Sequence, residues 1–288
     1  KAGQFYWGLL LMTLGMFEKV VLADAMLSGA ADSVFGYPGP LLALDAWGGV
    51  LAFAGQIFFD FAGYSTCAIG AALCLGFHLK DNFRFPYAAV GFSDFWRRWH
   101  ISLSTFLRDF VYFPLGGNRL GTARATINLM IVMFIGGLWH GAQWTFVVWG
   151  LIHGGLLVFE RVTRAIAGDY QEPRPFPVRL LLGLLTFAAV CFAWVFFRAA
   201  DFTTAARLVE AMAGVLPNGA PLLGTRQLVI VGIVTGGLLL AHWLLRETSL
   251  EHVVGRMPPW TVTTLWSLML GTIILTQESG HAFIYFQF

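Results

Sequence analysis

Residues 125–159 read ATINLMIVMFIGGLWHGAQWTFVVWGLIHGGLLVF and contain no Asp, Glu, Lys or Arg. An α-helix needs about 20 apolar residues to cross the roughly 30 Å hydrocarbon core of a bilayer, so this stretch is longer than one span. Gly136, Gly137 and Gly141 predict a break near its middle, beside Trp139 and His140. Because an ionisable side chain at bilayer depth is costly, we expect a functional role for His140.

The composition places the whole chain in a membrane. Hydrophobic residues make up 57% of its 288 residues, charged residues make up 12%, and the mean hydropathy is +0.70. Soluble domains carry about 25% charged residues. Leu180–Phe197, Gln227–Leu245 and Met257–Gln277 each reach or approach the length of a span. We therefore expect an all-α, polytopic membrane protein in contact with lipid. The net charge of +2, without a basic tail, argues against a nucleic-acid partner.

The beginning of the chain indicates missing upstream sequence. The chain starts at Lys1, without Met or a signal-peptide pattern. Its first apolar run, Phe5–Phe17, ends at the charged pair Glu18 and Lys19. We expect residues 1–288 to form a single integral-membrane domain that is the C-terminal part of a longer protein.

A second long apolar stretch, Ala46–Leu79, holds Asp60 as its only Asp, Glu, Lys or Arg. As one helix it would be about 50 Å long, so we expect a strong tilt or a break near Gly63 and Gly70. Asp60 and Tyr64 lie on one helical face. The carboxylate is either a buried, hydrogen-bonded structural group or part of the lining of a polar cavity.

Basic residues concentrate between these two stretches. Seven of the 18 Lys and Arg residues lie within Lys80–Arg124, which places this region on the cytoplasmic side by the positive-inside rule. Within it, Phe92–Ser104 predicts an amphipathic helix that is interfacial or re-entrant. We expect Ser93 to cap this helix, with Asp94 beside Arg98 and His100 beside Ser104.

An interfacial helix alone would explain the arginines and tryptophans of this segment, but it does not require His100. The segment continues into Arg108–Arg119, where Pro114 and the pair Gly116 and Gly117 end regular structure. Free backbone amides near arginines suit an anionic substrate group, although such loops are commonly only turns.

The remaining histidines and the cysteines carry weaker signals. His153 follows His140 by thirteen residues, about 20 Å of rise and roughly 220° of rotation on a continuous helix, so the two share no small site unless that helix breaks. We expect His153, four residues after Trp149, to be a hydrogen-bonded packing residue. His242, His252 and His281 have no supporting residues and stay unassigned. Cys67, Cys74 and Cys191 have no metal-ligand spacing, so we expect no metal.

The sequence contains no Walker loop, GxSxG elbow or HExxH motif. A neutral imidazole is a common general base for removing a proton from a hydroxyl group. Acyl transfer to a hydroxyl therefore fits these residues. A transporter or channel with a buried gating histidine remains an alternative.

Four motifs together resemble those of the membrane-bound O-acyltransferase family, and within it the branch of bacterial alginate O-acetylation membrane subunits. These motifs are FWRRWHISLS (95–104), RDFVYFPLGGNR (108–119), GLWHGA (137–142) and WGLIHG (149–154), and the resemblance extends to the terminal FIYFQF (283–288). It implies an irregular helical bundle with re-entrant elements around a buried tunnel. The family's essential histidine matches His140, and a second histidine of the bacterial branch matches His100.

The resemblance also implies a reaction and its partners. The acyl group would come from a cytoplasmic thioester, acetyl-CoA or another acyl donor such as a charged carrier protein, with no cofactor bound. It would pass across the bacterial inner membrane to a periplasmic acetyltransferase that modifies an exopolysaccharide such as alginate. D-alanyl transfer toward teichoic acid and acetyl transfer toward peptidoglycan or cellulose are alternatives. We expect the following residues to line the tunnel or contact substrate: Trp139, Trp144, Arg97, Arg108, Asp109 and Asn118.

Overall fold

The computed structural model describes residues 2–167, 175–215 and 219–276, and these residues form helices and connecting loops without a β-strand. Six of the helices are long and apolar enough to cross a membrane. They are α3 (Ala43–Cys74), α6 (Gly121–His140), α7 (Trp144–Ala167), α8 (Phe176–Arg198), α10 (Thr225–Leu245) and α12 (Pro259–Thr276). His281 and the terminal 283–288 segment lie outside the described residues.

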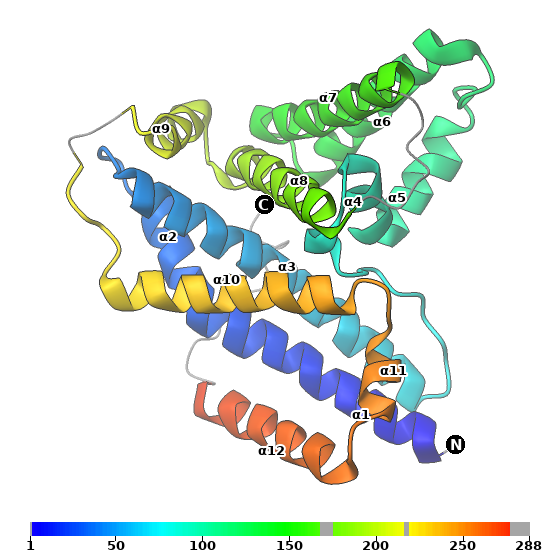
Figure 1. The fold of residues 1–288 in the computed structure, drawn as a ribbon, viewed down its shortest axis with the longest axis vertical. Helices are drawn as coiled ribbons and strands as arrows, with labels where there is room; N and C mark the ends of the chain where they lie inside the picture. The colour runs from blue at the N-terminus through cyan, green and yellow to red at the C-terminus, as the bar shows by residue number, and fades with distance from the viewer. Residues whose placement is uncertain (1, 168–174, 216–218, 277–288) are drawn as a thin grey trace. The chain divides into compact units, whose positions relative to one another are not determined.

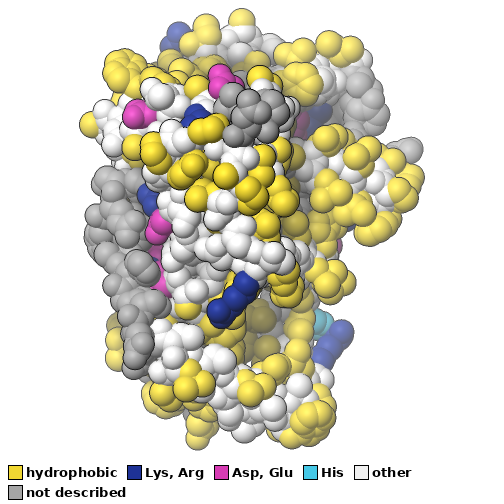
Figure 2. Space-filling model, turned by 90° about the vertical axis from the view of Figure 1, so that its left-hand side faces the viewer, with side chains coloured by type: hydrophobic (Ala, Val, Ile, Leu, Met, Phe, Trp, Pro, Cys, Tyr) yellow, Lys and Arg dark blue, Asp and Glu magenta, His cyan; other side chains and the backbone are white. Residues whose placement is uncertain are grey.

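The outer faces of these helices are apolar, as expected for contact with lipid tails. The face shown in Figure 2 carries only scattered charged side chains between hydrophobic ones. On α12, Trp260, Leu268 and Leu275 are 71%, 60% and 84% exposed. Exposed apolar surface on this scale is unusual for a soluble protein. The predicted spans 180–197, 227–245 and 257–277 are confirmed as α8, α10 and α12, apart from Gln277, which is not described.

The chain divides into two compact units, residues 1–82 with 210–288 and residues 83–209. The single domain expected from the sequence stays a prediction. The first unit contains α1 (Ala2–Met16), the π-helix η1 (Phe17–Ser28), α2 (Gly29–Gly36), α3, α10, α11 (Leu250–Gly255) and α12. Helix α9 (Phe202–Met212) contains the boundary between the units.

Helix α3 is continuous over 32 residues, so of the two expected alternatives, a strong tilt and a break near Gly63 and Gly70, the break is wrong. These glycines serve the contact with α1, which lies along α3 (Figure 1). A Cβ atom on Gly63 would lie 2.6 Å from the carbonyl oxygen of Gly15, and one on Gly70 would lie 2.5 Å from that of Gly8. Paired glycines therefore let the two backbones approach closely, as small residues do in membrane helix pairs.

Asp60 is buried and forms an ion pair with Lys19 of η1. The same ammonium lies 2.9 Å from Oδ1 of Asp24. Because a π-helix closes i to i+5 hydrogen bonds, residues five apart such as Lys19 and Asp24 fall on one side of it. Tyr64 is 57% exposed. The structure therefore supports the structural interpretation of Asp60.

The second unit contains the 3₁₀ turn η2 (Pro86–Ala88), α4 (Phe92–Arg98), α5 (Ile101–Leu107), the π-helix η3 (Arg108–Tyr112), α6, α7 and α8. The predicted break between α6 and α7 is confirmed at 141–143. Glycines again allow close backbone packing in this hairpin, since a Cβ on Gly137 would lie 2.4 Å from the carbonyl oxygen of Phe146. Leu103 and Leu107 of α5 pack on Val132 of α6.

Candidate active site

The histidine-containing segment 92–104 is two helices rather than the single helix expected. His100 separates α4 from α5 and adopts the left-handed conformation, with φ 43° and ψ 56°. Histidine is among the few residue types enriched in this conformation. The carbonyl oxygen of His100 then accepts from the Ser104 amide at 3.0 Å, which starts α5. The turn therefore aims His100 away from the direction that a continuous helix would give it.

The break also changes the hydroxyl group that contacts His100. Ser104 lies beside His100 as expected, because its amide bonds the His100 carbonyl oxygen, but its Oγ donates to the carbonyl oxygen of Trp99 at 3.3 Å. Instead, Ser102 Oγ lies 3.3 Å from His100 Nδ1. A hydroxyl group at one ring nitrogen influences which nitrogen carries the proton.

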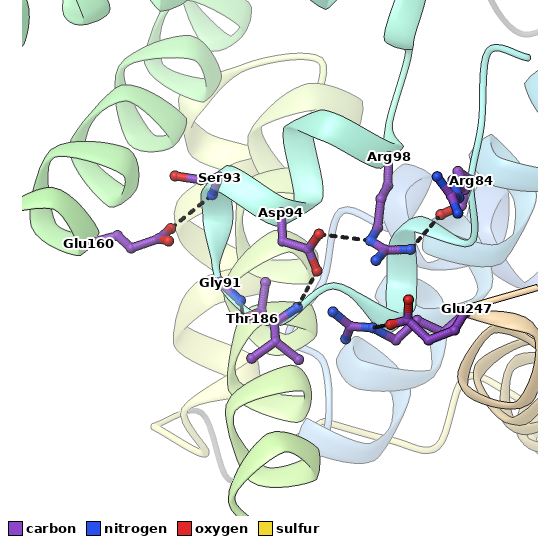
Figure 3. Close-up of polar contacts among 10 residues, drawn as sticks. Arg84, Gly91, Ser93, Asp94, Arg98, Glu160, Thr186 and Glu247 are labelled. Atoms are coloured by element: carbon purple, nitrogen blue, oxygen red, sulfur yellow. Dashed lines mark hydrogen bonds and ion pairs between the residues drawn. The ribbon is translucent and has the colours of Figure 1, made fainter. Parts of the chain in front are cut away.

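Two other helices hold the beginning of α4 (Figure 3). Glu160 Oε2, on α7, accepts from the Ser93 amide at 2.8 Å. Thr186 Oγ1, on α8, accepts from the Gly91 amide at 2.9 Å. The expected N-cap role of Ser93 is therefore wrong: Gly91, at φ 95°, is the cap, and the Glu160 carboxylate takes the place of a capping side chain. Glu160 also pairs with Arg164.

The other end of α4 is closed by the expected Asp94–Arg98 pair, which is confirmed at 2.9 Å (Figure 3). Asp94 Oδ2 accepts from the Val90 amide at 3.0 Å, and Arg98 Nη1 donates to the carbonyl oxygen of Arg84 at 3.2 Å. The Arg84 amide in turn donates to the carbonyl oxygen of Arg98 at 2.9 Å. Both ends of the short helix before His100 are thus fixed by side chains.

The structure brings His100 and His140 to the same tryptophan. The ring of Trp139 lies 5.9 Å from that of His100 and 5.0 Å from that of His140. His140, at the last position of α6, also contacts Trp149 of α7 and Phe197 of α8, each at a centroid distance of 5.0 Å. Rings from α6, α7 and α8 therefore pack around the half-buried His140.

His153 lies next to Trp149 on α7, with ring centroids 4.9 Å apart. The break after His140 folds α7 back along α6. As a result, both His140 and His153 contact the ring of Trp149. The expected hydrogen bonding of His153 is wrong within the described residues, where neither ring nitrogen has a partner. His153 is fully buried, and its ring packs on other rings.

Burial keeps His100 neutral. The side chain is 7% exposed, and removal from water lowers the pKa of His100 from 6.5 to about 4. A neutral imidazole at physiological pH can accept a proton. No group of three His, Cys, Asp or Glu side chains able to hold a metal ion is found in the part of the chain that the structure describes.

The other expected site residues lie outside this group of rings. Arg97, Arg108, Asp109, Asn118 and Trp144 are all exposed. Arg108 pairs with its neighbour Asp109 at 2.7 Å, and Asn118 accepts from the Tyr112 hydroxyl at 2.6 Å. Their contact with substrate, and that of the exposed Trp139, stays a prediction.

Several residues that shape the site were missed in the sequence. Trp149 and Phe197 pack on His140, and Glu160 and Thr186 hold α4. One signal was available for Glu160, which is the charged residue that ends the charge-free stretch and lies seven residues, two helical turns, after His153. The fully buried Asn128 was also missed, although its amide donates to the carbonyl oxygens of Leu115 and Gly117 in the 113–120 loop.

Comparison with known proteins identifies relatives of this chain. The sequence profile described as MBOAT, membrane-bound O-acyltransferase family, matches residues 43–202, which include every residue of the site above. "Probable alginate O-acetylase AlgI" of Azotobacter vinelandii is 46% identical over 198 residues, which are 69% of this chain and 38% of that protein. The protein of the same name from Pseudomonas aeruginosa is 41% identical over 244 residues, 83% of this chain and 44% of that protein.

A relative with a different name, "Peptidoglycan O-acetyltransferase" of Helicobacter pylori, is 41% identical over 215 residues, 75% of this chain and 40% of that protein. The chain thus spans about two fifths of the length of these relatives. The profile covers more than half of the chain, and six of its helices are suited to cross a membrane. The chain is therefore part of a multi-pass membrane protein and belongs to the membrane-bound O-acyltransferase family.

Proposed function

We propose that this chain holds the acyl-transfer site of an enzyme that takes acetyl from a cytoplasmic thioester and passes it across the membrane for O-acetylation of an exopolysaccharide such as alginate. The observation that carries the proposal is the meeting of His100 and His140 on the ring of Trp139. Both histidines belong to the segment that matches the family.

In the proposed reaction, the neutral imidazole of His140 removes the proton of the acceptor hydroxyl group as its oxygen attacks the thioester carbonyl carbon. The new C–O bond forms, the C–S bond breaks, and the thiolate leaves with the proton from the imidazolium, so the histidine returns to its neutral form. His100 orients the acceptor or shares the proton. On the side that the buried rings of Trp149 and Phe197 cover, His140 is shielded from water, which limits hydrolysis of the thioester there.

Acetyl-CoA is the proposed donor. The segment 80–124 contains seven Lys and Arg residues, an excess that is typical of the cytoplasmic side of the bacterial inner membrane. A basic surface also attracts an anionic donor. The proposed recipient of the acetyl group is a periplasmic acetyltransferase partner.

Peptidoglycan is a second candidate acceptor, because a relative 41% identical to this chain is named as its O-acetyltransferase. Cellulose acetylation and D-alanyl transfer toward teichoic acid are further outcomes that a donor and polymer assay separates. Membranes containing the protein are supplied either with labelled acetyl-CoA or with a carrier protein charged with D-alanine. Label in alginate from acetyl-CoA supports the proposal, whereas label only from the charged carrier contradicts it.

His140→Ala tests the site itself. We expect polymer acetylation to be lost while the amount of protein in the membrane stays the same. His252→Ala, which changes an exposed histidine of α11, is the matched control and should leave acetylation unchanged. Acetylation retained in His140→Ala, or passage of an intact solute without consumption of thioester, would show that the chain is not this acyltransferase.

A further inference from the structure

His153 is a buried titratable side chain to which the proposed reaction gives no role. It is fully buried, and rings from three helices surround it. They are Phe95 (5.8 Å, 11°) and Trp96 (5.1 Å, 79°) of α4, Trp149 (4.9 Å, 65°) of α7 and Trp194 (6.5 Å, 63°) of α8, given as centroid distance and interplanar angle. An apolar ring would fill this space equally well.

The polar edges of this cluster are its unusual feature. Within the described residues, Nδ1 and Nε2 of His153 and Nε1 of Trp96 and Trp149 are buried without a hydrogen-bond partner. Buried polar groups in native proteins are rarely left without a hydrogen-bond partner. Phe at position 153 would avoid the loss of hydration, so a packing role does not explain the histidine. The near-perpendicular ring contacts allow an N–H group to point at a ring face instead.

Trp149 connects His153 to the reacting histidine. Its indole contacts the imidazole of His140 at 5.0 Å and 88°, and that of His153 at 4.9 Å and 65°. Trp149 is 1% exposed, and Phe197 packs against it at 5.2 Å. The rotation of the indole is thus restricted by His153, and the indole in turn restricts the ring of His140.

We infer that His153 is a positioning residue of the acyl-transfer site, whose ring nitrogens hold the Trp149 indole edge-on against His140. This inference rests on the proposed function. His153 itself does not contact the substrate and transfers no proton; it acts through Trp149. A small displacement of a reacting group from its aligned position reduces the rate of the chemical step much more than the binding of substrate.

His153→Phe tests the inference, because it keeps a ring of similar size and removes both nitrogens. We expect kcat for acetyl transfer to fall about 10-fold while KM for acetyl-CoA stays within about twofold. We expect the melting temperature to stay the same or rise, because a buried polar group without a partner is removed. A merely structural role predicts the reverse pattern, with unchanged kcat for each folded molecule.

The matched control is His242→Phe on α10, where another buried histidine packs edge-on against Phe58 at 4.7 Å. This variant should keep the parent kcat. A double-mutant cycle of His153→Phe and Trp149→Phe tests whether His153 acts through Trp149. If it does, the double variant should lose no more activity than Trp149→Phe alone.

Equal kcat values for His153→Phe and His242→Phe would overturn the inference, as would independent, multiplying losses in the double variant. Should His153→Phe fail to accumulate, His153→Gln, which keeps a polar group without the ring, replaces it in the same cycle. The failure of the proposed function is seen separately, because then His140→Ala itself would retain acetylation.

Discussion

The two units keep ionisable side chains inside an apolar helical bundle in different ways. In the first, the Lys19 ammonium lies between the carboxylates of Asp24 and Asp60. In the second, His100 and His140 pack on tryptophan and phenylalanine rings. The opposite charges keep these groups ionised, and the ion pair of Lys19 with Asp60 connects η1 to α3. Burial lowers the pKa of His100 and favours its neutral imidazole, which suits a group that accepts and returns a proton.

Lys19→Met should have the largest effect on stability, because it leaves two carboxylates in the bundle without their ammonium. Breaking a buried ion pair from one side costs about 3–5 kcal/mol. We expect a loss of this size in the unfolding of the detergent-solubilised protein. The control is the triple variant with Asp24→Asn and Asp60→Asn, which should recover most of the loss. A single variant as stable as the parent would show that the charges do not hold this joint.

Acidification should reveal the opposite behaviour in the second unit. The folded-state pKa of His100 is about 4, below the 6.5 of an exposed histidine, so the unfolded chain binds a proton that the folded chain does not. Stability from this group is complete above pH 6.5 and is lost as the pH falls toward 4. At about 1.4 kcal/mol for each pKa unit, the loss approaches about 3 kcal/mol.

The measurement compares thermal unfolding at pH 7.5 and pH 5 in the parent and in His100→Gln, which lacks the titrating group. We expect the melting temperature of the parent to decrease more on acidification than that of the variant. Identical losses in both proteins would mean that burial of His100 does not contribute to the pH dependence.

Glu160→Ala should have a smaller effect, because it removes the carboxylate that caps α4 while the contacts of Thr186 and Arg98 remain. Loss of a helix cap costs about 1 kcal/mol. We expect a similar loss of stability and a lower rate of acetyl transfer, since α4 leads directly to His100. Glu160→Gln should lose less, because its amide oxygen can still accept from Ser93. Glu251→Ala, at an exposed position of α11, is the control, and an equal effect of both alanine variants would contradict the capping role.

Ser102→Ala should have the smallest effect. Its hydroxyl group lies 3.3 Å from His100 Nδ1, which is long for such a hydrogen bond. We expect acetyl transfer to slow by about two- to fivefold, the equivalent of roughly 0.5–1 kcal/mol. Ser102→Thr should keep most of the rate, and Ser33→Ala, at an exposed serine of α2, should keep all of it. A larger loss than that of Glu160→Ala would place Ser102 above the helix cap in importance.

Helix prediction from the sequence succeeded where the signal was local. The lengths of α8, α10 and α12 follow from runs of apolar residues, and the break after His140 follows from the nearby glycines. Gly63 and Gly70 were misread because a glycine that interrupts a helix and one that receives a neighbouring helix look the same in sequence. The break at His100 was missed because contacts that fix α4, the short helix before it, come from far along the chain: Glu160 and Thr186, which hold the beginning of α4, are 67 and 95 residues away from their partners.

The sequence by itself determined that this is a helical membrane protein with a functional candidate at His140, because hydropathy is summed over a short window and an isolated ionisable group is visible within it. Only the tertiary structure decided which side chains meet. The pairing of Asp60 with Lys19 and the link from His153 through Trp149 to His140 depend on which faces of distant helices pack together. Those faces are selected by close backbone approach at glycines and by ring packing, which no local window of sequence contains.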